Sequence, residues 1–497
     1  MGNEHIKGRK KCASFFNYLS TEEMNRITYL FLLLSWTCFT AMAQHQLETY
    51  PAPEGAALND DFDVAVRIPG GEWKHVDTYA FKVDEVVNYR HTERLTSVAT
   101  FDFEGQVEVR VKSKTGPVAT SRVRPLSYQI QTQTVDSTLA FTLSQPRNIS
   151  VEVNGDIYRN LQLFACPMDA NKPKKKKMKN LIYFAPGIHQ LQGDSLHIPS
   201  GTTVYLAGGA VLKGFLSTYG NDDIRICGRG IVDPGRHEGV MVRYSRNVEV
   251  DGIITTQMPV GGSENVRITN CKVISWYGWG DGFNVFASNK VYYDQVFART
   301  SDDCSTIYCT RKGYHGGCKD IMVRNAVYWA DVAHPIMIGL HGDIEKNEVI
   351  EHVVYDQVDI LDQAEYQVDY QGCIGINNGD NILVRDVTFL HIRIENMRKG
   401  MLFNFRVCFN KKYCTAPGRG IENVTLRDIS YQGEGERMSV MAGYNEERSI
   451  KNIRFENFLY NGKVISDDMP EKPKWYKTSD MANLFIGEHV GEVTFSR

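Results

Sequence analysis

Residues 276–308, WYGWGDGFNVFASNKVYYDQVFARTSDDCSTIY, contain the repeat unit that decides the fold. Within them, VYYDQVFART (291–300) alternates apolar and polar side chains on either side of a polar kink. Alternation with a period of two residues is typical of a β-strand, whereas an amphipathic helix repeats every 3.6 residues. The stretch therefore predicts two short strands joined by a bend.

The same pattern recurs along the second part of the chain. Similar segments occupy residues 224–233, 248–257, 266–275, 321–330, 353–362, 382–391, 424–433 and 453–462. Successive segments begin 18 to 42 residues apart, which is the spacing of a solenoid. Their high Val and Ile content and the absence of helical periodicity favour strands over helical repeats. We therefore predict an all-β chain with a right-handed parallel β-helix over residues 181–497.

Residues 46–170 carry short apolar segments separated by turn signals. Examples are FDVAVRI (62–68), TSVATFDF (96–103), YQIQTQT (128–134) and TLAFTL (138–143). Such spacing predicts an N-terminal antiparallel β-sandwich before the β-helix. No acid pair, metal cluster or nucleophile stands out in this part of the sequence, so we expect a structural or substrate-orienting module. The lysine-rich residues 171–180 are interpreted as a solvated linker.

The first 43 residues predict a signal peptide for export. A basic Arg26 precedes an apolar run, and Ala41-Met42-Ala43 is a candidate cleavage site. The residues before Met24 make the signal unusually long, so Met24 is the expected start. A single membrane span is the alternative, but the run is shorter than the ~20 residues that a span needs. We expect a secreted or periplasmic protein without stable membrane insertion after signal removal.

Charge and cysteine content narrow the possible partners. A formal net charge of −3 at pH 7 gives no electrostatic case for nucleic-acid binding. Cys408 and Cys414 flank a short loop and are the pair that we expect to form a disulfide, if any does. Most of the other cysteines are better explained as small buried hydrophobes. No cysteines have zinc-type spacing, and we expect neither a metal nor a cofactor.

Three aspartates are the candidate catalytic residues: Asp281, Asp302 and Asp303. The first two lie 21 residues apart, about one coil of the predicted β-helix, and stacked coils are ~4.8 Å apart. Carboxyl groups brought together in this way cannot all ionise freely, so at least one pKa must rise. A general acid beside a general base requires this, and glycoside hydrolysis uses such a pair. A turn cap or a structural cation site is the alternative.

The substrate-binding candidates are Trp279, Asn284, Tyr308, Lys312 and His341. Aromatic faces can stack on sugar rings, and cationic side chains can bind hydroxyl or acidic groups. Each candidate also has a structural interpretation. The aromatic residues could pack in the core, and Lys312 could lie in a solvated loop. His341 could be a structural histidine, and Asn284 could belong to an internal asparagine ladder.

The motif GDGFN (280–284), followed one coil later by SDDC (301–304), resembles the β-helical glycoside hydrolases of families 28 and 49. These are the polygalacturonases and the dextranase–isopullulanase group. Residues 307–343 resemble family 49 more closely, and that family also carries an N-terminal β-sandwich. Trp279 stands where the polygalacturonases have an Asn, and their Arg-Ile-Lys is absent, so binding of galacturonate in their manner is not expected.

The resemblance implies a polysaccharide or oligosaccharide as substrate. It implies that Asp302 is the general acid, with Asp281 and Asp303 orienting and deprotonating water in an inverting hydrolysis. Two other functions stay open: a polysaccharide lyase, which usually needs a Lys or Arg base and often calcium, and a non-catalytic glycan-binding β-helix. The sequence leaves open the sugar, the linkage, internal or terminal cleavage, and the oligomeric state.

Overall fold

The computed structural model describes residues 45–174 and 179–497. The predicted signal peptide over residues 1–43 lies outside the described residues. Residues 46–497 form one compact unit. Among the described residues, no helix is long and apolar enough to cross a membrane.

Two sheets are built from residues 46–167. The six-stranded sheet contains β1 (Gln46–Thr49), β4 (Tyr79–Val87), β5 (Arg90–Glu104), β7 (Ser121–Arg124), β10 (Arg147–Val153) and β11 (Asp156–Pro167). The five-stranded sheet contains β2 (Phe62–Arg67), β3 (Lys74–Val76), β6 (Val107–Ser113), β8 (Gln133–Val135) and β9 (Thr138–Leu143). Buried residues of both sheets share one core, including Val64, Val109 and Phe101. This arrangement is the predicted sandwich.

Two details of the sandwich differ from the prediction. The pair β5–β11 is parallel, so the larger sheet is mixed and not purely antiparallel. Residues 128–134 are not one strand. A 3₁₀ helix covers Leu126–Tyr128, and strand pairing resumes only at Gln133. Gln129 adopts a left-handed backbone (φ 51°), which interrupts the extended conformation that the alternating sequence suggests.

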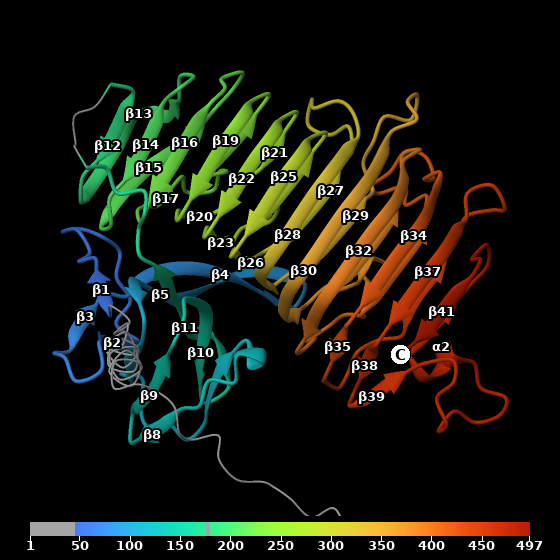
Figure 1. Cartoon of the computed structure of the whole chain (residues 1–497), viewed down its shortest axis with the longest axis horizontal. Helices are drawn as coiled ribbons and strands as arrows, with labels where there is room; N and C mark the ends of the chain where they lie inside the picture. Colours follow the sequence, from blue (N-terminus) through green and yellow to red (C-terminus); the bar gives the residue numbers. More distant parts are fainter. Residues whose placement is uncertain (1–44, 175–178) are drawn as a thin grey trace, which may run out of the picture. The chain divides into compact units, whose positions relative to one another are not determined.

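The rest of the chain, from Leu181 to Ser496, forms a single parallel sheet of 30 strands that winds into coils. Figure 1 shows the coils stacked in chain order from β12 to β41. This is the predicted parallel β-helix. Each complete coil places strands in three rows, and each strand pairs with the strand of the same row in the next coil.

The first row contains β12 (Leu181–Phe184), β14 (Thr203–Leu206), β16 (Ile224–Gly228), β19 (Arg246–Asp251), β22 (Glu264–Thr269), β25 (Asn289–Asp294), β34 (Gly420–Arg427), β37 (Ile450–Glu456) and β41 (Val493–Ser496). Three long strands bend to serve both the first and second rows: β28 (Cys318–Ala330), β30 (Val349–Gln363) and β32 (Leu383–Ile394).

The second row contains β17 (Ile231–Asp233), β20 (Ile254–Thr255), β23 (Lys272–Ile274), β26 (Phe297–Thr300), β35 (Ser430–Tyr431) and β38 (Phe458–Tyr460), with β39 (Lys463–Ile465) antiparallel to β38. The third row contains β18 (Val240–Arg243), β21 (Val260–Gly261), β24 (Phe283–Phe286), β27 (Ser305–Tyr308), β29 (Ile336–Gly339), β31 (Ile374–Asn378), β33 (Phe403–Val407), β36 (Ser439–Ala442) and β40 (Leu484–Ile486). β13 (Gly187–His197) and β15 (Ala210–Ser217) begin the stack, and a short helix α2 (Thr478–Met481) lies near its end.

The kink that each repeat shows in sequence is a bend between the first and second rows. The bend residue has a positive φ in coil after coil: Gly252 (80°), Asn270 (50°), Gln295 (55°), Asn325 (50°) and Gln357 (57°). Glycine and asparagine tolerate this left-handed conformation best. In the segment 382–391 the bend residue is His391 (φ 51°), which the β30–β32 register places level with Gln357.

Columns of β-branched residues fill the interior. Val248, Val266, Val291, Ile321 and Val353 are directly opposite one another in successive coils, and each is at most 1% exposed. Burying one such side chain contributes about 1.5–3 kcal/mol. Because side chains alternate between faces, a one-residue slip would expose a whole strand of them. The columns therefore fix the register between coils.

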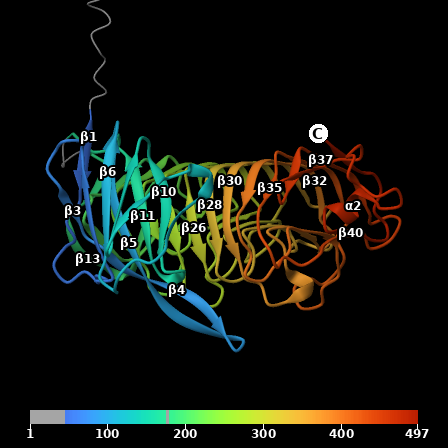
Figure 2. The same ribbon diagram turned by 90° about the horizontal axis from the view of Figure 1, so that it is seen from below.

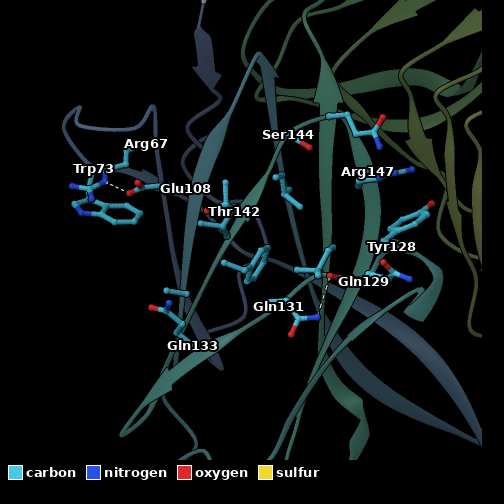
Figure 3. A pocket seen from close by; sticks show the side chains of 16 residues that line it. Arg67, Trp73, Glu108, Tyr128, Gln129, Gln131, Gln133, Thr142, Ser144 and Arg147 are labelled. Carbon is cyan, nitrogen blue, oxygen red and sulfur yellow. Dashed lines mark hydrogen bonds and ion pairs between the residues drawn. The ribbon is translucent and has the colours of Figure 1, made fainter.

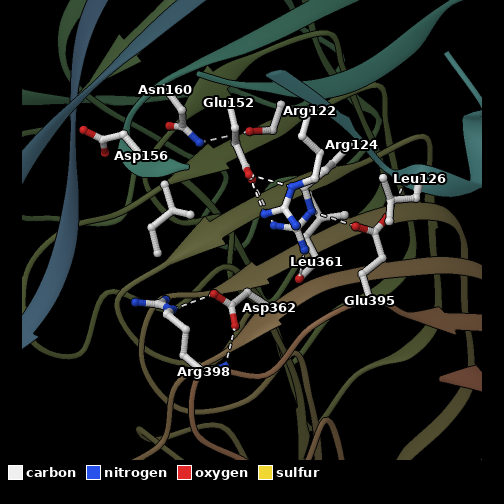
Figure 4. Close-up of polar contacts among 12 residues, drawn as sticks. Arg122, Arg124, Leu126, Glu152, Asp156, Asn160, Leu361, Asp362, Glu395 and Arg398 are labelled. Carbon is white, nitrogen blue, oxygen red and sulfur yellow. Dashed lines mark hydrogen bonds and ion pairs between the residues drawn. The ribbon is translucent and has the colours of Figure 1, made fainter. Parts of the chain in front are cut away.

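The sandwich packs against the outer face of the second row. Phe164 of β11 meets Phe297 of β26, with ring centroids 5.0 Å apart. Buried ion pairs accompany this contact, as Figure 4 shows for one group. Arg124 donates from Nε to Glu395 of the β-helix (2.7 Å) and from Nη1 to Glu152 of the sandwich (3.0 Å). These contacts fix the position of the sandwich on the coils.

We predict that Asp102→Ala destabilises the protein by about 3–5 kcal/mol, because it leaves the buried guanidinium of Arg229 without its closest counter-charge. The two groups lie 2.8 Å apart, with side chains at most 3% exposed. Chemical denaturation measures the loss. The control is Asp222→Ala, which breaks the exposed pair with Arg246 and should change the unfolding midpoint little. Equal shifts for both variants would contradict the prediction.

Candidate active site

The three candidate aspartates lie in turns between the second and third rows. Asp281 precedes β24, and Asp302 and Asp303 precede β27 in the next coil. Phe283 is opposite Ser305, and the N–H of Gly282 donates to the carbonyl of Asp303 (2.8 Å). This register places Asp281 level with Asp303, whereas the 21-residue spacing suggested Asp302. In the following coil the same position is taken by His334, because Thr306 is opposite Met337.

All three aspartates line one pocket of about 300 Å³. Asp281 and Asp302 are partly exposed, and Asp303 is buried (4% exposed). The pocket also takes side chains from two further coils, among them Glu365 and Tyr370. The structure therefore brings the three carboxyl groups together at a place that solvent can reach.

Asp303 is held by three hydrogen bonds. The Tyr308 hydroxyl donates to Oδ2 (3.0 Å), and the backbone N–H and ring Nδ1 of His334 both bond Oδ1 (3.1 and 2.6 Å). The other ring nitrogen of His334, Nε2, bonds the carbonyl oxygen of Tyr370. A carbonyl oxygen only accepts, so Nε2 carries a proton. Nδ1 is thereby held against Asp303 Oδ1, and the two side chains form a buried histidine–carboxyl pair.

The pKa of His334 is raised on balance. Burial alone would lower it, but the charge and hydrogen bond of Asp303 outweigh burial. Sequence reasoning missed this residue, because its place beside Asp303 depends on a coil that is 31 residues long here. A search for polar residues one coil length after Asp303 could have found it only with the register known.

The pKa values of the other two carboxyl groups, Asp281 and Asp302, are both raised. Removal from water and the charge of Asp303 raise the pKa of Asp281 to about 7, although Asn284 Nδ2 donates to its Oδ2 (2.7 Å). Burial and the charges of Asp281 and Asp303 raise the pKa of Asp302 well above its ordinary range. The pocket therefore combines one carboxyl held by three hydrogen bonds, one that titrates near neutrality and one whose pKa is raised well above its ordinary range.

Four of the five substrate-binding candidates line the same pocket: Trp279, Tyr308, Lys312 and His341. Trp279 is 77% exposed. Tyr308 also positions Asp303. Burial, together with Arg311 and Lys312, lowers the pKa of His341 to about 3, so its ring is neutral.

The structure does not support the predicted contact between Asn284 and a substrate. Its side chain is fully buried, and it joins Asp281 to Thr306, whose hydroxyl donates to Asn284 Oδ1 (2.6 Å). Its neighbours Phe283 and Val285 point into the core, so Asn284 lies on the outer side of β24, where its side chain is covered. It therefore positions Asp281 without contacting a substrate, and it is not part of an internal asparagine ladder.

The expected disulfide is also not present. Cys408 and Cys414 are both free thiols, as are the other described cysteines. The loop between them supplies Lys412 and Tyr413 to the pocket. Tyr413 stacks on Tyr370 with centroids 4.6 Å apart. Neither tyrosine stood out in the sequence, because each lies in an irregular loop far along the chain from the aspartates.

Two other groups of polar side chains lie outside this pocket, and neither indicates a ligand-binding site. A pocket of about 660 Å³ in the sandwich (Figure 3) contains Trp73, but the guanidinium groups of Arg67 and Arg110 lie 4.4 and 4.7 Å from its ring centroid. They occupy the ring surface that a sugar would need. Glu351, His352 and Asp386 cluster on the β-helix surface. Lys319 (3.2 Å) and Arg385 already pair with Glu351, so a cation is not indicated there.

Fold and pocket together define a parallel β-helix protein with three aspartates gathered beside one row of turns. No family model and no curated protein matches the sequence. Among solved structures, Dex49A from Penicillium minioluteum superposes with a TM-score of 0.55 at 14% identity, covering 90% of this chain and 96% of that one. The likeness shows a shared fold. The family 28 exopolygalacturonase from Yersinia enterocolitica gives 0.47 at 11% identity, covering 79% and 96%.

We predict that Asp303→Asn lowers the pKa of Asp281 below about 7, because it removes the negative charge that contributes most after desolvation. Carbon-13 NMR of aspartate carboxyl groups across a pH series measures the shift. Asp320→Asn, which changes an exposed aspartate at an outer corner, is the control. An unchanged Asp281 titration in the Asp303 variant would show that the two groups are not electrostatically coupled.

Proposed function

We propose that this protein is a glycoside hydrolase that cleaves a polysaccharide or oligosaccharide by inverting acid–base hydrolysis. The observation that carries the proposal is that the three carboxyl groups share one pocket in different surroundings. The pKa of Asp302 is raised well above its ordinary range and that of Asp281 to about 7, whereas Asp303 is held by Tyr308 and His334. Hydrolysis of a glycosidic bond needs this combination of a proton donor and a proton acceptor.

In the proposed reaction, Asp302 donates its proton to the glycosidic oxygen as the bond to the anomeric carbon breaks. Asp281 and Asp303 orient a water molecule on the opposite face of the sugar, and Asp281 takes the proton that this water loses on attack. Asp303 accepts three hydrogen bonds from Tyr308 and His334, and the acceptor site that remains on the carboxylate suits it to orienting the water. The sequence resemblance to families 28 and 49 supports the same assignment of roles.

The proposal defines the substrate as a class of glycans and names no particular sugar. The fold is shared with Dex49A, and Arg311 and Lys312 line the pocket, so a screen must include neutral α-glucans and polyuronates. Export through residues 1–43 to the periplasm or the medium is also part of the proposal, and suits an enzyme that meets polymeric glycans. A glycan-binding protein without activity would gain nothing from gathering three acidic groups, which repel one another.

A lyase is less well supported. Elimination next to a uronate carboxylate needs a strong base at the sugar and, often, a bound calcium ion. The pocket instead contains a carboxyl whose pKa is raised well above its ordinary range, that of Asp302, which suits a proton donor and not a base. Release of an unsaturated product that absorbs in the ultraviolet would favour the lyase over the hydrolase.

We predict that Asp302→Asn lowers kcat by about 10²–10⁴-fold, because the amide cannot donate the proton that the leaving oxygen requires. Reducing-end release from the best substrate of the screen measures the loss. Asp320→Asn, at an outer corner away from the pocket, should keep full activity. Undiminished turnover by the Asp302 variant would refute its role as the general acid.

We further predict that the first product formed has the anomeric configuration opposite to that of the bond cleaved. Inversion follows from attack by water, without a covalent sugar–enzyme intermediate. Proton NMR of the anomeric region in the first minutes of hydrolysis, before mutarotation, distinguishes the two outcomes. Retention of configuration would require one of the aspartates to act as a nucleophile instead.

A further inference from the structure

The hairpin of β4 and β5 extends from the sandwich along the row of turns that holds the aspartates. Its strands pair from Tyr79–Val98 to Val87–Arg90. The two-residue turn of Asn88 and Tyr89 has positive φ at both positions, the geometry of a tight hairpin turn. Figure 2 shows this hairpin projecting as a long two-stranded ribbon.

Contacts at both ends fix the hairpin to the β-helix. Near its base, the Lys82 ammonium lies 4.2 Å from the ring centroid of Trp276, in the coil of Asp281. Near its tip, the Tyr366 hydroxyl donates to the carbonyl of Val86 (3.1 Å), and the Tyr89 and Tyr366 rings meet edge to face. In the sequence, the turns that carry Asp281, Asp303 and His334 lie between these two contact residues, Trp276 and Tyr366.

His91 is the hairpin residue that reaches the pocket. Its Nδ1 bonds the fully buried carboxyl of Asp84, which also accepts the N–H of Thr92 (3.1 Å). Its Nε2 points toward Gly278, where an added Cβ would lie 3.9 Å away. Within the described residues, this Nε2 has no hydrogen-bond partner. Asp84 thus fixes the ring so that one nitrogen is left for a ligand.

Trp279 follows Gly278 in the chain and lines the same pocket as His91. Its indole is 77% exposed, while its backbone carbonyl is anchored by Gln257 Nε2 (3.0 Å). Gly278 has no side chain, so this residue does not fill the pocket next to His91 Nε2. An aromatic face and a polar ring nitrogen in one pocket match a sugar unit, which offers an apolar face and hydroxyl groups at its edge.

We propose that His91 and Trp279 form a subsite for one sugar unit at the mouth of the pocket, so that the N-terminal sandwich contributes directly to substrate binding. The inference rests on the proposed glycan substrate and extends the binding site beyond the β-helix. His91 exchanges a hydrogen bond with a sugar hydroxyl through Nε2, and Trp279 stacks on the ring.

The test compares His91→Ala, His91→Gln and Trp279→Ala with the control His75→Ala, an exposed histidine of the sandwich outside the pocket. Loss of one hydrogen bond to the substrate should raise KM about 3- to 10-fold in His91→Ala with little change in kcat. His91→Gln should recover part of the loss, because an amide also hydrogen-bonds hydroxyls. Thermal unfolding of each variant shows whether the hairpin remains folded.

Two readouts separate this inference from the proposed function. Glycan hydrolysis by the wild type tests the function, and calorimetric binding of the same oligosaccharide to Asp302→Asn, with and without His91→Ala, tests the subsite. If the wild type hydrolyses a glycan but His91→Ala and Trp279→Ala behave like His75→Ala, the subsite is wrong and the function stands. If the wild type binds without turnover, weaker binding by His91→Ala still supports the subsite. If no glycan binds, both proposals fall.

Discussion

The hydrogen-bond register between successive coils is the constraint on which the pocket depends. Phe283 opposite Ser305, and Thr306 opposite Met337, place the turns before β24, β27 and β29 in one row. A slip of one residue would turn the side chains of a strand to the other face and separate Asp303 from His334. The interior columns of Val and Ile prevent that slip, since any other register would expose them. The packing of the core therefore also fixes the geometry of the site.

Within this frame, small differences in surroundings give chemically similar side chains different properties. Asp303 has three hydrogen bonds, one of them to the ring of His334, so its charge is compensated. Asp302 receives one backbone N–H, from Asp303 (2.9 Å), and lies close to two other carboxyl groups. Like charges in a poorly hydrated site cannot all persist. The proton therefore stays where compensation is weakest, on Asp302, and this gives the cluster a direction for proton transfer.

The sequence predicts the repeated parts of this molecule well and the irregular parts poorly. The coils and the three aspartates follow from period-2 alternation and from coil-length spacing, both of which are local patterns. His334, Tyr370 and His91 could not be predicted in the same way. Their positions depend on the lengths of turns between rows, on loops without periodicity and on how a separate module docks. Asn284 illustrates the limit within a strand: we expected a substrate contact or an internal ladder, whereas the side chain is buried on the outer side of β24.

The docking of the sandwich matters for the pocket because the hairpin moves with it. Asp102 and Arg229, and Arg124 between Glu152 and Glu395, are charges buried at the contact. Buried ion pairs add little net stability over apolar packing, since desolvation offsets most of their attraction, but each tolerates only one arrangement of its partners. They are therefore suited to fixing the orientation of the sandwich on the second row. A purely apolar contact could slide by one coil, about 4.8 Å, which would carry His91 from the coil of Gly278 to the next one.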